Sequence, residues 1–190
     1  MPFAGAELYA KKRFLSATEC HELVARIDDR RRPSGLADHD GTPGYRTSET
    51  CDLDPADPLV ATVRARLAGY AGLDPATAEP LQGQRYAVGQ EFKQHTDYFE
   101  PGGEGYEAHC GAAGQRTWTL MVYLNEPGAG GATRFRQLDK IIQPETGKLV
   151  AWNNLLPDGQ PNYATLHQGM PVRKGTKYVI TAWFRERPWP

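Results

Sequence analysis

Cysteine is scarce in this chain of 190 residues: only Cys20, Cys51 and Cys110 occur, and they are widely spaced. An odd number of cysteines without a Cys-x-x-Cys pair predicts neither a disulfide framework nor a structural zinc site. Reduced thiols fit a cytoplasmic protein best, so the sequence predicts a cytoplasmic location. No segment resembles a signal peptide and no apolar run approaches the length of a membrane span, so we expect no membrane partner.

An excess of charge of either sign is also missing. The chain has 22 Lys and Arg against 23 Asp and Glu, which gives a formal net charge of -1. This balance gives no electrostatic reason to expect nucleic acid as a partner. The length is sufficient for one domain with a sizeable core, and we predict a single domain over residues 1–190. The sequence leaves the oligomeric state open.

Two helices are predicted in the N-terminal part of the chain, which we expect to form a helical support over about residues 1–81. The segment Ser16-Ala17-Thr18-Glu19 matches a capping box, and apolar residues recur behind it at helical spacing to about residue 31. The pair Asp54-Pro55 offers an N-cap followed by a proline in the first turn. The apolar stripe that follows it predicts a second helix ending near Gly72.

Strands are predicted from about residue 82 onward. The clearest is 116–124, where apolar residues alternate over nine positions. Many short strands with turn signals between them favour a mainly β fold, a jelly roll or barrel over residues 82–187, with the helices packed on one sheet. Two loops are predicted at 33–44 and at 100–115. The second is rich in glycine and lies beside the candidate site, where loops often act as lids.

The candidate site begins with His95 and Asp97, which flank a single residue. Alternate side chains of an extended strand share a face, so the imidazole and the carboxylate can point into one site. Such a pair suits a borderline metal such as ferrous iron. A His-x-Asp triplet is common among surface residues, however, so a metal site needs a third ligand from elsewhere in the chain.

His167 is the best candidate for that third ligand. It lies at the end of a strand predicted over residues 163–167, where a jelly roll brings strand ends together. His109, in the glycine-rich loop, is a weaker rival. Two histidines and one carboxylate on one face of an octahedral metal would leave three positions open for a bidentate cosubstrate and O2.

Lys177 opens the last predicted strand, whose two faces are both apolar. A strand that is apolar on both faces is covered on both sides, so a lysine within it needs a partner for its charge. The remote carboxylate of a dicarboxylate ligand would be such a partner. The alternative is that Lys177 reaches water at the start of the strand.

Four segments in this order resemble the iron(II)/2-oxoglutarate-dependent dioxygenases, and more narrowly their prolyl 4-hydroxylase branch. The first is the run Arg-Tyr-x-x-Gly-Gln-x-Phe-x-x-His-x-Asp-Tyr-Phe at residues 85–99. Residues 115–125 resemble the central strand of that branch, and Gly130-Gly131-Ala132-Thr133-Arg134-Phe135 resembles its Gly-Gly-x-Thr-x-Phe turn. Residues 174–178 together with Trp183 resemble its closing strand.

The resemblance implies a double-stranded β-helix as the jelly-roll core, with Fe(II), 2-oxoglutarate and O2 as cofactor and cosubstrates; ascorbate is compatible with it as an accessory reductant. The implied ligands of iron, which are also the catalytic residues, are His95, Asp97 and His167. The implied contacts of the remote 2-oxoglutarate carboxylate are Lys177 and Tyr86. The residues implied near the substrate are Arg116 and Trp183, with Tyr98 as a further candidate at the border of the pocket.

The implied activity is hydroxylation of an unactivated C–H bond, most naturally in a prolyl residue of a peptide or protein. Two departures leave the substrate open: residues 168–172 replace the branch's usual Cys-Pro-Val segment, and Phe92 stands where many members have tyrosine. The alternatives are a hydroxylase of a free amino acid or another small molecule, a cupin-like metalloenzyme without 2-oxoglutarate, and a non-catalytic binding module. A cupin-like site would need no dicarboxylate anchor such as Lys177 with Tyr86.

Overall fold

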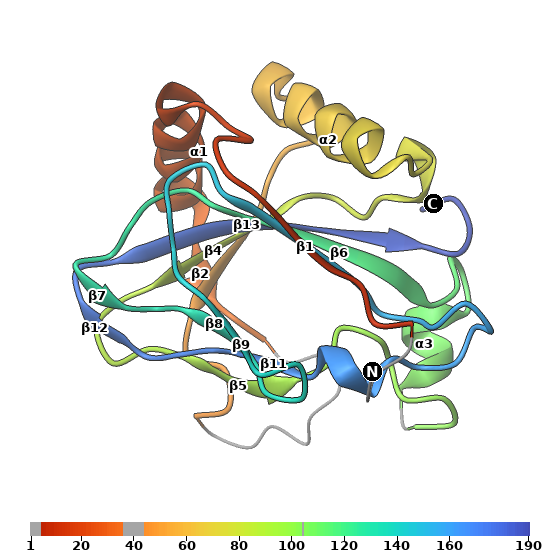
Figure 1. The fold of residues 1–190 in the computed structure, drawn as a ribbon. Helices are drawn as coiled ribbons and strands as arrows, with labels where there is room; N and C mark the ends of the chain where they lie inside the picture. The colour runs from red at the N-terminus through yellow and green to blue at the C-terminus, as the bar shows by residue number, and fades with distance from the viewer. Residues whose placement is uncertain (1–4, 36–43, 104) are drawn as a thin grey trace.

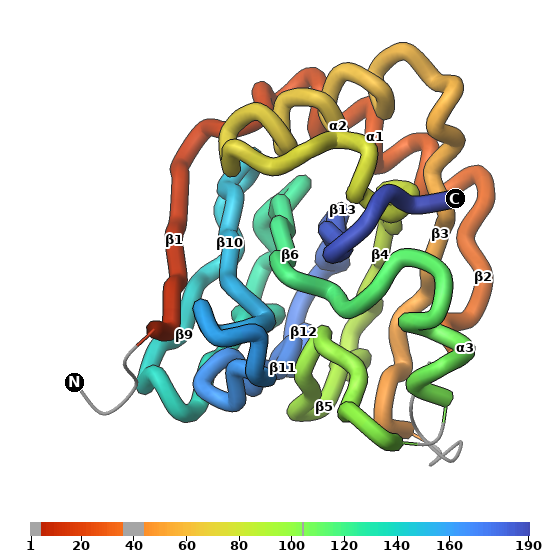
Figure 2. The backbone as a smooth tube through the Cα atoms, turned by 90° about the vertical axis from the view of Figure 1, so that its right-hand side faces the viewer, coloured from red at the N-terminus to blue at the C-terminus, as the bar shows by residue number. Residues whose placement is uncertain are grey.

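The computed structural model of the chain describes residues 5–35, 44–103 and 105–190. These residues form a large and a small β-sheet that pack against each other, and two long helices lie on the outer face of the large sheet (Figure 1). Figure 2 shows the same layers from the side, with strands β1 and β2 at the two edges of the large sheet. This arrangement is the double-stranded β-helix with N-terminal helices that the sequence predicts, and the prediction is confirmed.

The large sheet has seven strands among the described residues, in the order β1-β10-β6-β13-β4-β3-β2, and all neighbours are antiparallel. Its strands are β1 (Leu8–Lys11), β2 (Arg32–Pro33), β3 (Glu49–Asp52), β4 (Gln82–Tyr86), β6 (Arg116–Tyr123), β10 (Leu149–Asn153) and β13 (Lys177–Arg185). The central pair β6 and β13 separates the helices from the small sheet.

The small sheet has the order β5-β11-β8-β9, and a two-stranded ribbon of β12 and β7 lies beside it. These strands are β5 (Phe92–His95), β7 (Ala129–Gly130), β8 (Thr133–Phe135), β9 (Lys140–Ile142), β11 (His167–Gly169) and β12 (Val172–Lys174). They are short, and β5 and β11 are the two that carry candidate metal ligands.

Alternation along β6 and β13 divides the core into two clusters. Leu120, Val122, Ile180 and Phe184 face the helices, whereas Met121, Tyr123 and Val179 face the small sheet. Both strands are therefore covered on both faces, as the sequence predicts for the last strand. The candidate site lies in the second cluster, between the two sheets.

Helix α1 (Ala17–Arg30) begins with the predicted capping box. The Ser16 hydroxyl accepts from the Glu19 amide, and the Glu19 carboxylate accepts from the Ser16 amide. The buried face of the helix packs on β4, where Gly83 allows the approach: a Cβ there would lie 2.4 Å from Cγ1 of Ile27. Helix packing on this face leaves the opposite face of the sheet free for the site.

Helix α2 (Pro58–Ala71) is present, but its predicted N-cap was wrong by three residues. Asp57, and not Asp54, caps the helix, with its carboxylate accepting from the amides of Leu59 and Val60. Asp57 also binds Arg26 of α1 at 2.8 Å, a tertiary contact that the local Asp-Pro signal cannot reveal. The helix ends as predicted at Gly72, which is in the left-handed region at φ 67°.

The remaining connections contain short helical turns: η1 (Pro75–Thr77), η2 (Tyr163–Thr165) and α3 (Tyr106–Cys110). The strand predicted over 163–167 was therefore wrong, because buried Asn162 caps η2 and His167 begins a strand instead of ending one. Helix α3 lies inside the predicted loop 100–115. Arg185 donates to the carbonyl oxygens of His109 and Gly114 and so holds this segment. Most of the predicted loop 33–44 lies outside the described residues.

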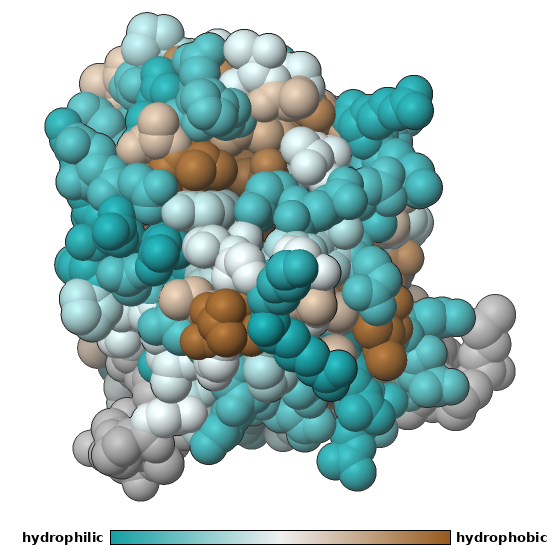
Figure 3. All heavy atoms as spheres, turned by 90° about the vertical axis from the view of Figure 1, so that its left-hand side faces the viewer, coloured by the Kyte–Doolittle hydropathy of each residue, from teal (hydrophilic) through white to brown (hydrophobic). Residues whose placement is uncertain are grey.

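On the face drawn in Figure 3, brown apolar side chains form separate small groups among hydrophilic ones. The large apolar side chains that are exposed in the described ranges are scattered over the chain: Tyr9, Tyr70, Val88, Ile141 and Tyr163. None of the described helices is both long enough and apolar enough to cross a bilayer.

Candidate metal and cosubstrate site

Backbone pairing between β5 and β11 brings the two candidate histidines together. His95 is the last residue of β5 and His167 the first of β11, and the two are directly opposite each other in the antiparallel pair. Their ring centroids lie 4.2 Å apart. Residues 72 positions apart in the chain thus present two imidazoles to one point between the sheets.

Asp97 completes this group from the bend that follows β5. Its Oδ1 lies 3.8 Å from Nε2 of His95, and its Oδ2 lies 3.9 Å from Nε2 of His167. One potential ligand atom from each of the three residues lies within 4.8 Å of the others, the one such group found in the described ranges. We expected both His95 and Asp97 on a strand; the strand ends at His95, and the bend brings the carboxylate to the same point.

The two histidines are oriented with Nε2 toward Asp97. Nδ1 of His95 donates to the Lys93 carbonyl oxygen at 2.8 Å, and Nδ1 of His167 donates to the Thr165 carbonyl oxygen at 2.9 Å. Because a carbonyl only accepts, the ring proton belongs on Nδ1 and the lone pair on Nε2 faces the site. Burial, with the neighbouring His167, lowers the pKa of His95 to about 3, so its ring is neutral at pH 7.

The Asp97 side chain is buried yet ionised. Burial alone would raise its pKa, but His167, His95, Arg116 and a hydrogen bond from Thr119 together hold the pKa below its ordinary value. One carboxylate and two imidazoles whose Nε2 atoms face the same point are the donor set of a non-haem Fe(II) site. The residues present therefore fit the metal that the resemblance implies. His109, the weaker rival, lies in α3, where its ring stacks on Phe99, and it is not part of this group.

Lys177 lines the same cavity as the three candidate ligands. The side chain is only 2% exposed, and burial lowers its pKa to about 7. Its Nζ lies over the rings of Tyr86 at 4.9 Å and Tyr123 at 5.4 Å, and it forms no ion pair with any residue that the structure describes. The alternative that Lys177 reaches water is wrong. A buried cation without a counter-ion, aimed into a cavity, fits a ligand that carries a carboxylate.

Tyr86 lies opposite Lys177 in the pairing of β4 with β13. Its ring lines the cavity, but its hydroxyl donates to Oε1 of Gln84 at 2.7 Å. A hydrogen bond from Tyr86 to 2-oxoglutarate would therefore replace the one to Gln84. Its role as a cosubstrate contact stays a prediction.

Trp183 lines the cavity, and Arg116 lies flat on it, with Cζ 3.9 Å from the ring. Arg116 is held there by Glu79, which accepts from its Nε at 2.7 Å and from its Nη2 at 2.9 Å. Tyr98 is buried but is not among the residues that line the cavity; its ring packs edge-on against Tyr163. Of the three predicted substrate residues, only Trp183 lines the cavity, while Arg116 contacts it through Trp183. Their substrate roles stay predictions.

Arg46 is a residue near the site that the sequence did not reveal. Its guanidinium lies over the ring of Phe92, 4.9 Å from the centroid, and donates to Oε1 of Gln82 at 2.9 Å. Burial lowers its pKa, while the charge of Asp97 acts in the opposite direction. An isolated arginine between a loop and a strand carries no sequence signal that distinguishes it from a surface residue.

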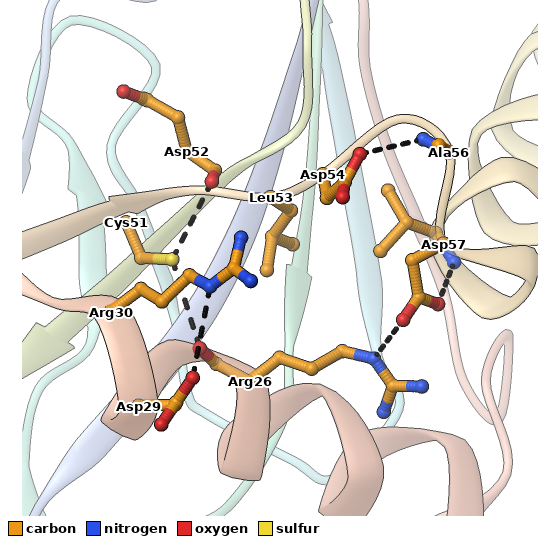
Figure 4. A pocket seen from close by; sticks show the side chains of 10 residues that line it. Arg26, Asp29, Arg30, Cys51, Asp52, Leu53, Asp54, Ala56 and Asp57 are labelled. Carbon is orange, nitrogen blue, oxygen red and sulfur yellow. Dashed lines mark hydrogen bonds and ion pairs between the residues drawn. The ribbon is translucent and has the colours of Figure 1, made fainter.

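A larger cavity of about 250 Å³ lies elsewhere, between α1 and the connection from β3 to α2 (Figure 4). The metal cavity has only about 40 Å³ of free volume. Both arginines of the larger cavity are paired with carboxylates of its lining: Arg26 with Asp57 and Arg30 with Asp29. The smaller cavity holds the candidate ligands and Lys177, which has no ion-pair partner in the part of the chain that the structure describes, so the chemistry of the lining, and not the volume, identifies the site.

The comparison with protein families agrees with this geometry. The family model of the 2OG-Fe(II) oxygenase superfamily matches residues 81–185, more than half of the chain. The chain therefore belongs to the 2OG-Fe(II) oxygenase superfamily. The predicted class of enzyme, with Fe(II), 2-oxoglutarate and O2, is confirmed at this level.

Relatives narrow the resemblance to the prolyl 4-hydroxylase branch. The chain is 35% identical to prolyl 4-hydroxylase subunit alpha-1 of Gallus gallus over 147 residues, which are 77% of this chain but only 28% of that protein. It is similar to the solved structure of a viral collagen prolyl hydroxylase from Paramecium bursaria Chlorella virus 1 in complex with 2OG, with 27% identity, a TM-score of 0.73, and coverage of 94% and 95% of the two chains.

A third similarity concerns the fold alone. A prolyl hydroxylase of Trichoplax adhaerens, solved with a peptide fragment of hypoxia-inducible factor, has 14% identity and a TM-score of 0.68, with coverage of 94% of this chain and 83% of the other. Because the chain spans little more than a quarter of the curated relatives that it matches, their activity and substrates do not transfer directly. The individual roles of the site residues also remain predictions.

Proposed function

We propose that the protein is an Fe(II)- and 2-oxoglutarate-dependent dioxygenase that hydroxylates a prolyl residue of a peptide or protein. The observation that carries the proposal is the buried ammonium of Lys177, which has no counter-ion among the described residues and lies in the same cavity as His95, Asp97 and His167. Bound iron and 2-oxoglutarate would supply the oxidation: O2 places one oxygen atom in the C–H bond of the substrate and the other in succinate, and CO2 is released.

Different residues of the chain would bind the metal and the cosubstrate. His95, Asp97 and His167 would hold iron through two imidazole nitrogens and a carboxylate oxygen. Lys177 would pair with the remote carboxylate of 2-oxoglutarate, and Tyr86 would exchange its hydrogen bond with Gln84 for one to the same carboxylate. Buried aromatic rings pack against these groups and would exclude water from them: Tyr123 against Lys177, and Phe135 and Trp152 against His167.

Two aromatic rings of the cavity and the relatives support a prolyl substrate. Trp183 and Phe92 line the cavity, and the guanidinium groups of Arg116 and Arg46 lie over these rings, 3.9 Å and 4.9 Å from the centroids. Aromatic faces suit the ring of a proline, and guanidinium groups suit the carbonyl oxygens of a peptide. The curated relative and the viral structure are both named as prolyl hydroxylases.

Mass spectrometry and succinate release would test this function. The purified protein, with Fe(II), 2-oxoglutarate and O2, is incubated with a proline-rich peptide or with free L-proline. We expect a gain of one oxygen atom on a prolyl residue of the peptide, matched by succinate, and neither product with Asp97→Ala. Oxygen transfer only to free proline would support the small-molecule alternative. Turnover that does not consume 2-oxoglutarate would refute the proposal in favour of a cupin-like enzyme.

The predicted cytoplasmic location and the absence of nucleic-acid and membrane partners belong to the same proposal. They rest on the balanced charge and on the three cysteines, which are all buried. Ascorbate as an accessory reductant is likewise part of the proposal and would be tested by its effect on sustained succinate release.

A further inference from the structure

We propose that Thr119 and Asn154 are positioning residues that fix the carboxylate of Asp97 for metal binding. The proposal rests on the proposed metal site but not on the identity of the substrate. Neither residue lies near the candidate ligands in sequence, and neither stands out by residue type. Their role emerges from a chain of two hydrogen bonds behind the ligand.

The chain runs from the core outward to the ligand. Thr119, on β6, donates from Oγ1 to Oδ2 of Asp97 at 2.7 Å. Asn154, just after β10, donates from Nδ2 to Oγ1 of Thr119 at 2.8 Å. Thr119 and Asn154 are 0% exposed, and Asp97 is 7% exposed. Water therefore does not compete for these groups, and each hydrogen bond constrains the next.

The direction of both hydrogen bonds is fixed by the chemistry of the donors. An ionised carboxylate only accepts, so Thr119 must use its single hydroxyl proton on Asp97. Thr119 can then only accept from Asn154, so the amide must present its NH2 group to the hydroxyl. The carboxylate receives a defined donor on Oδ2, and no residue in the described ranges donates to Oδ1.

The orientation of Asn154 supports a functional reason for the arrangement. Its Oδ1 is buried and has no hydrogen-bond partner among the described residues, an unfavourable situation for a carbonyl oxygen. With the amide flipped, Oδ1 of Asn154 and Oδ2 of Asp97 would both face the Thr119 hydroxyl as acceptors. The hydroxyl has one proton, so the hydrogen bond to Asp97 would no longer be fixed. The backbone holds Asn154 firmly, because its N–H donates to Thr117 and its carbonyl accepts from Asn162.

The consequence concerns how Asp97 presents its oxygens. Oδ2 is engaged by Thr119, which leaves Oδ1, 3.8 Å from Nε2 of His95, as the oxygen available to a metal. Hydrogen bonds of this kind orient a ligand before the metal arrives. Without the Thr119 hydroxyl, the carboxylate is free to rotate or to bind through both oxygens, which would occupy a position needed for the cosubstrate.

The test measures metal affinity directly, with Mn(II) as a redox-stable substitute for Fe(II). Mn(II) binding to the purified protein is followed by electron paramagnetic resonance, and the melting temperature is recorded for the same samples. We expect Thr119→Val to weaken Mn(II) binding by about 10- to 100-fold, the usual effect of losing such a partner. Thr119→Ser keeps the hydroxyl and should restore most of the affinity.

Asn154→Leu distinguishes a positioning role from a purely structural one. The substitution removes the donor to Thr119, so we expect weaker Mn(II) binding. It also removes the buried Oδ1, which has no partner among the described residues, so we expect no lower melting temperature. Thr117→Val is the matched control: its hydroxyl donates to the Phe184 carbonyl at 3.1 Å, away from Asp97, and Mn(II) affinity should be unchanged.

Two results would overturn the inference in different ways. If the unmodified protein binds Mn(II) but Thr119→Val and Asn154→Leu, both folded, bind it equally well, the positioning role is refuted and the metal site stands. If the unmodified protein binds neither Mn(II) nor Fe(II), the proposed metal site is refuted and the positioning role falls with it. Should Thr119→Val fail to fold, Asn154→Leu decides alone.

Discussion

Replacing Lys177 by methionine would test the cosubstrate site most directly. Methionine keeps much of the length of the side chain but removes the charge. Lys177 is 2% exposed, contacts two tyrosine rings and has no ion-pair partner in the described part of the chain. In the ligand-free protein its charge is therefore unfavourable, and only a bound anion would compensate it.

The size of this effect follows from the pKa of Lys177, which burial lowers from 10.5 to about 7. At about 1.4 kcal/mol for each pH unit, burial disfavours the ammonium by roughly 5 kcal/mol. Removing one partner of a buried charge pair costs about 2–5 kcal/mol of binding free energy. We therefore expect Lys177→Met to weaken 2-oxoglutarate binding by about 30-fold to several thousand-fold.

The assay is an anaerobic titration of the Fe(II) protein with 2-oxoglutarate, followed by the visible charge-transfer band that needs both components. Calorimetry with Mn(II) in place of Fe(II) gives an independent dissociation constant. Lys174→Met is the control, because Lys174 is exposed at the end of β12 and should not affect the titration. An unchanged dissociation constant in folded Lys177→Met would refute the assignment of Lys177 to the cosubstrate.

The same pKa predicts two pH dependences of opposite sign. The unfolded chain keeps the Lys177 proton up to about pH 10.5, whereas the native, ligand-free chain releases it near pH 7. Between these values the unfolded state binds more protons, so this residue's contribution makes stability rise with pH, and the contribution is absent in Lys177→Met. Binding of 2-oxoglutarate requires the protonated form, so affinity should fall above about pH 7, by at most about tenfold per pH unit.

Three further substitutions test the framework around the site, each by urea denaturation. Glu79→Ala leaves buried Arg185 and partly buried Arg116 without their shared carboxylate and should lower the free energy of unfolding by about 3–5 kcal/mol; a loss below 1 kcal/mol would contradict a stabilising role of this pairing. Ser16→Ala removes the capping hydroxyl of α1 and should cost about 1 kcal/mol. Gly83→Ala places a methyl group against Ile27 and should cost about 1–3 kcal/mol, whereas unchanged stability would show that α1 can move away.

The sequence predicted those parts of the site that depend on short-range patterns. The alternation along residues 116–124 gave both faces of β6, and the one-residue spacing of His95 and Asp97 identified the first two candidate ligands. Asp54 and Asp57 show the limit of such patterns. Each is followed by proline, and only the contact of Asp57 with Arg26, 31 positions away, shows which one caps the helix.

The residues that the sequence did not reveal act through contacts between distant segments. Arg46 reaches the site across Phe92, which is 46 positions away, and Asn154 acts on Asp97 only through Thr119. Threonine and asparagine are also ordinary residues of strands and turns, so their type gives no indication of a role at a metal site. A pattern along one chain cannot show a hydrogen bond whose partners the fold alone brings together.

The position of β13 explains why Lys177 is buried. This strand lies in the middle of the large sheet, with the helices on one face and the small sheet on the other, so its first residue, Lys177, is buried. A lysine at an edge strand would be solvated and would gain little from a carboxylate. At this central position water is excluded from the ammonium, and no carboxylate of the described residues pairs with it. An anion that binds beside the candidate metal ligands would therefore compensate the unfavourable burial of the Lys177 charge.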